Sequence, residues 1–245
     1  SAPFSTHSPA TMMLHGDAEI RIVMKFVFSR LRVMATVAAL GGAALTPAVS
    51  AAPATAPNPA VAEDDVLARI ERYLNDVQSM EAGFIQEAPD GVVTEGKLSL
   101  ERPGKLRFEY KGDIPLLVVA DGSTLTFVDY DVKQVTRWPI GETPLGILVA
   151  RNIDLRKDLE TTVTRGADKL IRVRIVDPKR ADQGFMTLIF EDRPLALRAW
   201  EVTDPQGYET RVTIVNPVYN TDIADALFTF KDPRSMPFSG RRGPR

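Results

Sequence analysis

Apolar and polar residues alternate with a period near two from Phe84 to Ile140. Alternation of this kind is typical of strands that bury one face and expose the other to water. Turn dipeptides, such as Pro103-Gly104 and Asp121-Gly122, separate the alternating segments. The pattern therefore predicts a curved antiparallel sheet with one apolar face.

The same alternation returns in the second half of the chain, where Met186, Leu188 and Phe190 share one face of a segment. Together the two halves predict about ten or eleven strands, so the expected fold is mainly β with a few helices. The expected strands cover residues 80–87, 92–101, 105–110, 116–120, 124–128, 134–138, 159–165, 169–176, 184–191, 195–203 and 209–216, and a last candidate strand covers residues 226–230.

An amphipathic helix is expected at residues 63–77. Apolar residues starting at Val66 recur there at the i, i+3, i+4, i+7 spacing. The acidic residues Glu63, Asp64 and Asp65 suit the positive N-terminal end of a helix. This helix is expected to close one end of the sheet.

A second, short helix is expected at residues 143–150, with Thr143 as its N-cap and Pro144 in the first helical position. The segment is almost wholly apolar, although the loops around it are polar. Two interpretations are open, namely a structural plug and a movable lid over a cavity. The residues expected to form the lid are Pro144, Leu145, Ile147 and Leu148.

A charged residue interrupts the apolar face of the predicted sheet. Leu98 and Leu100 share that face, and counting by two leads to Arg102, whose guanidinium is therefore expected on or at the rim of the apolar face. A concave apolar surface with one charged residue favours a ligand cavity over an enzyme active site. A structural arginine bonded to loop carbonyls is the alternative. The expected cavity lining is Phe84, Leu98, Leu100, Leu106, Phe108 and Phe127.

The N-terminal part of the chain differs in character from the rest. A basic stretch after Met24, an apolar run and small residues near Ser50 are together typical of a secretory signal peptide. An uncleaved membrane anchor is the alternative, but about a dozen apolar residues fall short of the roughly 20 that span a bilayer. The expected organisation is an upstream artefact segment (1–23), a signal peptide (24–51), a linker (52–62) and a single domain (63–245).

Composition excludes several classes of function. The chain has no Cys, and its only two histidines, His7 and His15, precede the expected mature protein. Ser-His and Cys-His nucleophile systems and the usual zinc sites are therefore excluded, and we expect no enzyme, no catalytic residue, no cofactor and no metal site. The formal net charge of −2 gives no basic excess, so no nucleic-acid partner is expected.

Several short motifs follow one another along most of the expected mature chain. They are found at residues 80–86, 96–110 around Arg102-Pro103-Gly104, 119–122, 134–136, 143–152 and 226–230. Each is a weak signal alone, but the series in this order resembles the LolA family. LolA is the periplasmic carrier of outer-membrane lipoproteins in Gram-negative bacteria.

The resemblance implies an unclosed antiparallel β-barrel with a helical lid over a hydrophobic cavity. It implies that the cavity takes the acyl chains of lipoproteins from an inner-membrane lipoprotein-releasing ABC transporter. The cargo would then pass to a LolB-like outer-membrane acceptor or to the outer membrane itself. The family's lid-contacting arginine corresponds to Arg102, and its aromatic positions after the turn to Leu106 and Phe108. Leu106 departs from the family, since a Phe often stands there. We expect a monomer in the periplasm.

Three other functions are alternatives to a lipoprotein carrier. A periplasmic sensor of mislocalised lipoproteins on the same fold usually carries an extra domain, for which this chain is too short. An enzyme with a barrel cavity is disfavoured by the lack of His and Cys. A carrier of other lipids, such as glycolipids or polyketides, has the same sequence pattern and stays open as an alternative.

Overall fold

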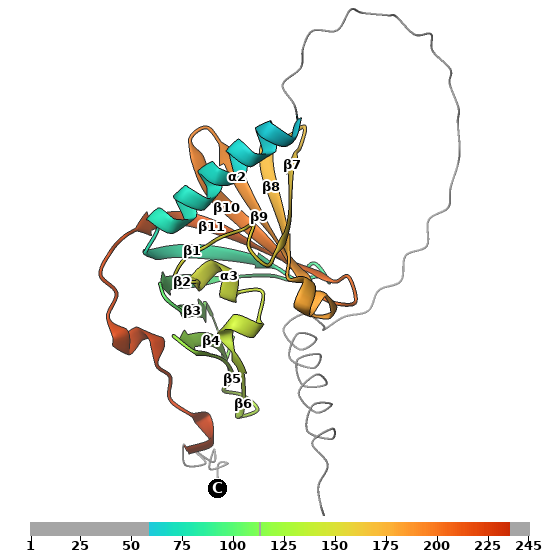
Figure 1. Cartoon of the computed structure of the whole chain (residues 1–245). Coiled ribbons are helices and arrows are strands. Elements are labelled where there is room, and N and C mark those ends of the chain that lie inside the picture. Colours follow the sequence, from blue (N-terminus) through green and yellow to red (C-terminus); the bar gives the residue numbers. More distant parts are fainter. Residues whose placement is uncertain (1–58, 113, 236–245) are drawn as a thin grey trace, which may run out of the picture.

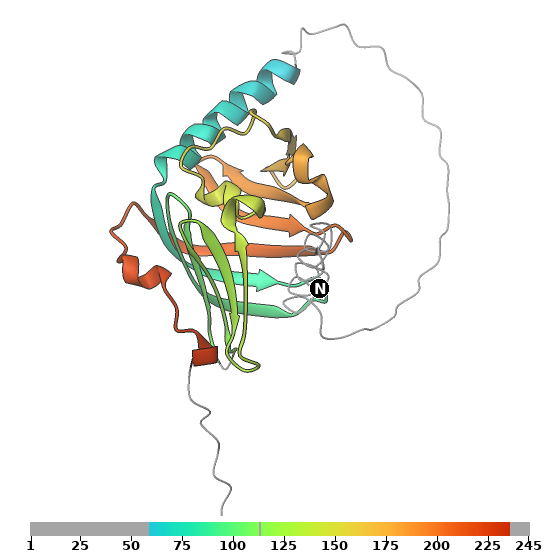
Figure 2. The ribbon, with the colours of Figure 1, turned by 60° about the horizontal axis from the view of Figure 1, so that its bottom comes forward.

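Eleven antiparallel strands form a single sheet in the computed structural model, which describes residues 59–112 and 114–235. The order is β6-β5-β4-β3-β2-β1-β11-β10-β9-β8-β7. Because β6 and β7 stand at opposite edges, the sheet curves without closing (Figures 1 and 2), and the predicted unclosed barrel is confirmed. The strands are β1 (Ser79–Glu87), β2 (Val93–Glu101), β3 (Lys105–Tyr110), β4 (Leu116–Asp121), β5 (Thr124–Asp129), β6 (Gln134–Pro139), β7 (Glu160–Arg165), β8 (Leu170–Val176), β9 (Phe185–Asp192), β10 (Leu195–Thr203) and β11 (Glu209–Tyr219).

Helices complete the described part of the chain. Figure 1 shows α2 lying across the β8–β11 half of the sheet, with α3 on the same side. No helix of the described residues combines the length and the apolar character needed to cross a bilayer. The helices are α2 (Pro59–Asp76), η1 (Ile140–Glu142), α3 (Gly146–Val149), η2 (Pro178–Gln183), η3 (Asp225–Phe228) and η4 (Pro233–Ser235), the η elements being 3₁₀ helices.

The apolar stripe of α2 packs against the concave face of the sheet. Ile70 is fully buried there, and the ring of Tyr73 meets the ring of Phe190 edge-on at 5.9 Å. The backbone N–H of Leu197 donates to the Tyr73 hydroxyl at 3.2 Å, and that hydroxyl also lies 3.1 Å from the hydroxyl of Tyr219. Apolar burial and these bonds fix α2 to β9, β10 and β11, so the helix covers that half of the concave face instead of one end of the sheet.

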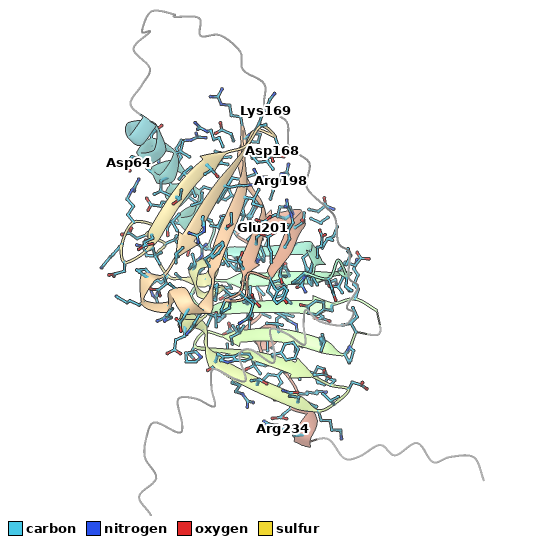
Figure 3. The ribbon with its side chains drawn as sticks, turned by 90° about the vertical axis from the view of Figure 1, so that its right-hand side faces the viewer. Asp64, Asp168, Lys169, Arg198, Glu201 and Arg234 are labelled. Carbon is cyan, nitrogen blue, oxygen red and sulfur yellow. The ribbon has the colours of Figure 1, made fainter. Side chains whose placement is uncertain are left out.

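The outer face of the β8–β11 half is polar. Arg172 pairs with Asp168 at 2.6 Å, and Arg211 pairs with Glu201 at 2.8 Å. Figure 3 shows Asp168, Arg198 and Glu201 along this side. Exposed ion pairs contribute little stability. The main apolar core of this half lies on the concave face, where Met186, Leu188 and Phe190 are fully buried.

The outer face of β3–β5 is covered by the segment that follows β11 (Figure 2). Apolar residues of β4 and β5, including Leu117, pack there with the buried ring of Phe228. A guanidinium nitrogen of Arg107 donates to the carbonyl oxygens of Leu227 and Thr229, at 3.1 Å each. These contacts hold the segment over the face of the sheet rather than beside an edge. The strand predicted at 226–230 is therefore wrong, because η3 occupies most of that range.

Two other boundaries differ from the sequence prediction. The short helix begins at Gly146 and not at Pro144, because the backbone N–H and the hydroxyl of Thr143 both donate to the carbonyl of Ile140 and end η1. The helix α2 begins at Pro59, inside the predicted linker, with proline in its favoured first position. The predicted upstream segment, the signal peptide and residues 52–58 of the linker lie outside the described residues.

Candidate functional site

A cavity of about 190 Å³ lies between the concave face of the sheet and the segment that runs from η1 to α3. Most of its wall is apolar. The sheet contributes Phe108, Val118, Leu125, Phe127, Trp138, Trp200, Val202 and Val212, together with the polar Gln86, Tyr110 and Thr210. The opposite wall consists of Glu142, Thr143, Pro144, Leu145 and Gln183.

The predicted cavity residues divide into two groups. Phe108 and Phe127 line the cavity. Leu100 lines a smaller pocket of about 20 Å³ beside Arg102 and Leu148. Trp200 belongs to the walls of both spaces, so the smaller pocket lies next to the main cavity.

The other three predicted residues, Phe84, Leu98 and Leu106, belong to the buried core of the same face and do not line the cavity. Gly96 of β2 explains the position of Phe84. A Cβ at Gly96 would lie 2.6 Å from the Phe84 ring, so the glycine leaves room for that ring. The ring of Phe84 then meets the ring of Phe108 edge-on at 5.2 Å. The predicted face is right for these residues, but they support the wall from the core.

The predicted lid residues also lie in different places. Pro144 and Leu145 line the cavity. Ile147 faces a neighbouring space of about 300 Å³ between the lid segment and η2. Leu148 is buried beside the smaller pocket. The N-terminal half of the segment therefore covers the cavity, and its C-terminal half anchors it.

Most wall residues were absent from the sequence prediction, among them Gln86, Tyr110, Trp138 and Trp200. The same count by two would have found Gln86 and Tyr110, because each follows by two a residue predicted to face inward. The tryptophans lie on β6 and β10, and the sequence does not show which part of these strands faces a cavity.

Arg102 lies where two helices end. Its Nε donates to the carbonyl of Leu148 at 3.0 Å, in the last turn of α3. Another guanidinium nitrogen donates to the carbonyl of Val77 at 2.7 Å and to the carbonyl of Leu74, both at the C-terminal end of α2. One side chain thus joins the lid segment, α2 and the β2–β3 turn.

The electrostatics of this junction are favourable. Carbonyl groups at a helix C-terminus lack partners within the helix and carry partial negative charge. Arg102 supplies both hydrogen-bond donors and a positive charge to them. Burial lowers the pKa of Arg102 to about 10, so the guanidinium stays charged at neutral pH. The N–H of Gly104 adds a bond of 2.8 Å to the carbonyl of Val149.

The lid segment has a second attachment at its N-terminal end. A guanidinium nitrogen of Arg180, in η2, donates to the carbonyl of Gly141 at 2.6 Å. Arg180 also lies 3.4 Å from the carboxylate of Asp177. The segment is thus held by an arginine at each end.

The chain after α3 is bound firmly to α2. The side-chain amide of Asn75 donates to the carbonyl of Ile153 and accepts from its N–H, both at 2.8 Å. The Glu71 carboxylate accepts from the N–H of Leu155 at 2.9 Å. These bonds leave the stretch between Ile140 and Ala150 as the part of the connection without such ties to α2.

Comparison with known proteins gives the family. The family model described as outer membrane lipoprotein carrier protein LolA matches residues 75–231. The chain belongs to the LolA family. The outer-membrane lipoprotein carrier protein of Chromobacterium violaceum is 28% identical over 200 residues, which cover 78% of this chain and 96% of that relative. The protein of the same name from Methylobacillus flagellatus is 29% identical over 178 residues, which cover 69% and 86%.

A solved LolA superfamily protein from Nitrosomonas europaea is also similar, with a TM-score of 0.39, 11% identity and coverage of 66% of this chain and 97% of that chain. The resemblance to LolA carried by the short motifs is confirmed by the family match. Membership in a family described as lipoprotein carriers supports a lipoprotein carrier role. In residues 59–112 and 114–235, no cluster of three or more His, Cys, Asp or Glu is placed to hold a metal ion.

Proposed function

We propose that this LolA family protein binds the acyl chains of lipoproteins released from the inner membrane and transfers them to the outer membrane. The observation that carries the proposal is the apolar cavity under the lid segment, whose wall includes Phe108, Phe127 and Trp200. Family membership supports the same role.

The energetics of such a carrier require a balance. Acyl chains gain about 0.8 kcal/mol per buried methylene, so a cavity that holds whole chains binds them tightly. A carrier must also release its cargo. A lid that closes well over the empty cavity lowers the net affinity, because its closing contacts are lost when cargo enters.

We assign Arg102 as the latch of this lid. Opening the segment at Leu148 breaks one hydrogen bond from a charged donor, worth about 1.5–3 kcal/mol, and the backbone bond between Gly104 and Val149. The bonds from Arg102 to α2 can persist in the open form. The free energy of the latch bonds is therefore large enough to favour release of the cargo and small enough to let the lid open.

The proposed pathway lies in the periplasm. The signal peptide at 24–51 directs export, and a single domain from residue 63 onward acts as a monomer without enzymatic activity. The proposed donor is the inner-membrane lipoprotein-releasing ABC transporter. The acceptor is a LolB-like protein or the outer membrane itself.

Native mass spectrometry of protein purified from the periplasm tests this function. The expected result is a fraction of molecules that carry an acylated lipoprotein in a one-to-one complex. A bound glycolipid or polyketide in place of a lipoprotein would overturn the cargo assignment. Incubation of the loaded fraction with acceptor membranes then tests delivery.

A further inference from the structure

One part of the cavity wall is polar. Gln86 of β1 and Tyr110 of β3 both line the cavity, and the Tyr110 hydroxyl donates to Oε1 of Gln86 at 3.0 Å. Thr210 of β11 also belongs to the wall. Gln86 is only 6% exposed and Thr210 only 5%. These polar groups face an interior space instead of bulk water.

The pair of Gln86 and Tyr110 has spare hydrogen-bond donors. A glutamine amide carries two N–H hydrogens and a tyrosine hydroxyl carries one. Among the described residues, the bond between the two side chains uses one of these three hydrogens. Because Tyr110 donates in this bond, the two donor hydrogens without an acceptor in the described structure are those of the Gln86 amide.

A neighbouring hydroxyl shows the same lack of a partner. Thr94 lies opposite Gln86 in the pairing of β1 with β2. Its Oγ1 is buried without a hydrogen-bond partner in the described structure. Buried polar groups are nearly always hydrogen-bonded, and leaving them unpaired is unfavourable. Gln86, unlike Thr94, lines the cavity, so an acceptor that enters there would give the Gln86 amide a partner.

The polar pair is rigidly placed. The ring of Phe84 meets the ring of Tyr110 edge-on at 5.3 Å. Tyr110 lies opposite Gly96 in the β2–β3 register, and the missing side chain there leaves room for the Phe84 ring that contacts Tyr110. Burial raises the pKa of Tyr110 to about 12, so its hydroxyl stays protonated and able to donate at neutral pH.

We propose that the Gln86 amide, held in place by Tyr110, binds the carbonyl oxygens of the ester and amide groups at the head of the cargo's acyl chains. The proposal rests on the carrier function above and assigns it a specificity site. Carbonyl oxygens accept hydrogen bonds and do not donate them, which matches a wall with spare donors. The hydrocarbon tails then contact the apolar wall, which includes Phe127 and Trp200. The site favours acyl esters over ligands of equal chain length that lack carbonyl groups.

A pair of synthetic lipopeptides tests the site. Both carry an N-terminal cysteine with two hexadecyl-length chains on a glyceryl group, joined by esters in one and by ethers in the other. Affinities are measured by displacement of a fluorescent fatty-acid analogue. We expect the wild-type protein to prefer the ester lipopeptide by about threefold to tenfold for each hydrogen bond made.

Two variants remove the donors without opening the wall. Tyr110→Phe deletes only the hydroxyl, the donor that holds the Gln86 amide in place, and Gln86→Leu replaces the amide by an apolar group of similar size. Each is expected to reduce the ester preference by about threefold or more, because affinity for the ester lipopeptide falls further than affinity for the ether lipopeptide. Tyr130→Phe is the matched control, since Tyr130 packs with the cluster on the outer face of β4 and β5. It should leave both affinities at the wild-type value.

The outcomes separate this site from the carrier function. Equal wild-type affinity for the two lipopeptides would overturn the carbonyl site and leave the carrier function standing. The same conclusion holds if both variants, folded by circular dichroism, weaken the two ligands equally. Failure of the wild-type protein to bind either lipopeptide would instead overturn the carrier function itself.

Discussion

Arg102 joins three parts of the protein through one guanidinium. Its partners are the carbonyl of Leu148 in the lid segment and the carbonyls of Leu74 and Val77 at the end of α2. A lysine could not replace it well, because one ammonium lacks the planar fork that reaches separate acceptors at once. The identity of the residue therefore matters as well as its charge.

The variant Arg102→Leu tests the latch. The lid would lose its bond at Leu148, so the open form becomes more favourable and the protein should hold acylated cargo more firmly. The loss of one bond from a charged donor, about 1.5–3 kcal/mol, corresponds to release slowed by about tenfold or more. Release of preloaded lipoprotein to acceptor membranes is the measurement.

The control for this prediction is Arg174→Leu. Arg174 lies 3.9 Å from the centroid of the Phe185 ring and contacts neither helix end. It should release cargo at the wild-type rate. Wild-type release from a folded Arg102→Leu variant would refute the latch and leave Arg102 a structural role.

At the level of elements, the connection between β6 and β7 has two parts, a lid at residues 140–150 and a strap at residues 151–157 that is fixed to α2. Asn75 and Glu71 bind the strap around Ile153 and Leu155 to α2. The lid, from η1 to α3, is held at its ends by Arg180 and Arg102. Motion is therefore expected between Ile140 and Ala150, with α2 and the strap staying in place.

A charge placed in the lid should open it. Leu145→Asp puts a carboxylate against the apolar cavity wall when the lid is closed, and an unpaired buried charge is strongly unfavourable. We expect faster amide hydrogen exchange at residues 140–150, with exchange in β8 and β9 unchanged. Val132→Asp is the control, because Val132 is 66% exposed in a turn. Equal exchange in the two variants would show that the lid is already open or cannot open.

The strap should respond separately from the lid. Asn75→Ala leaves the N–H and the carbonyl of Ile153 without their side-chain partner. Partly buried groups that lose a partner cost about 1–3 kcal/mol, so the free energy of unfolding should fall by about that amount. Urea unfolding measures it. The control is Asn220→Ala, which removes contacts to Gln78 and Asp76 outside the strap. Amide hydrogen exchange at residues 151–157 should rise in Asn75→Ala and stay at the wild-type rate in Asn220→Ala.

The strands were the most predictable elements. Lys105–Tyr110 and Leu195–Thr203 have the bounds expected from the sequence, because turn residues flank an alternating run in each case. The segment at 226–230 has a similar composition but covers a face of the sheet, and local alternation does not distinguish these two arrangements. Arg102 was found by counting along one strand.

The cavity itself was less predictable. Its position depends on which part of the concave face is covered by α2 and which by the lid, and that depends on contacts between residues far apart in sequence. Phe84 and Leu106 face inward as predicted, yet they lie in the core. Gln86 and Tyr110 are polar, and the alternating pattern identifies residues that line a cavity only where they are apolar.

At the scale of the whole molecule, one apolar core joins both halves of the sheet. It includes residues of α2, of β1–β3, of β8–β11 and of the lid, with Ile70, Leu106 and Ile171 all fully buried. The pairing of β1 with β11 connects the two halves through the backbone. The described part of the chain should therefore unfold as one cooperative unit.

The two tryptophans test this cooperativity. The chain has only Trp138 and Trp200, which lie on β6 and β10 in opposite halves and both line the cavity. Trp138→Phe and Trp200→Phe each leave one fluorescent reporter. The urea transitions of the two variants should each coincide with their own far-UV circular dichroism transition. A fluorescence transition separated from the circular dichroism transition would show that the halves unfold independently.

Bound cargo should stabilise both halves together. A ligand that binds only the folded state adds about 2.7 kcal/mol at a hundredfold excess over its Kd, which for a domain of this size corresponds to a rise in Tm of about 5–10 °C. Because the cavity wall draws on β3–β6 and on β10 and β11, the ester lipopeptide should raise the Tm reported by Trp138 and by Trp200 equally. A rise in Tm reported by only one tryptophan would mean that the acyl chains contact one side of the cavity and stabilise only that half of the sheet.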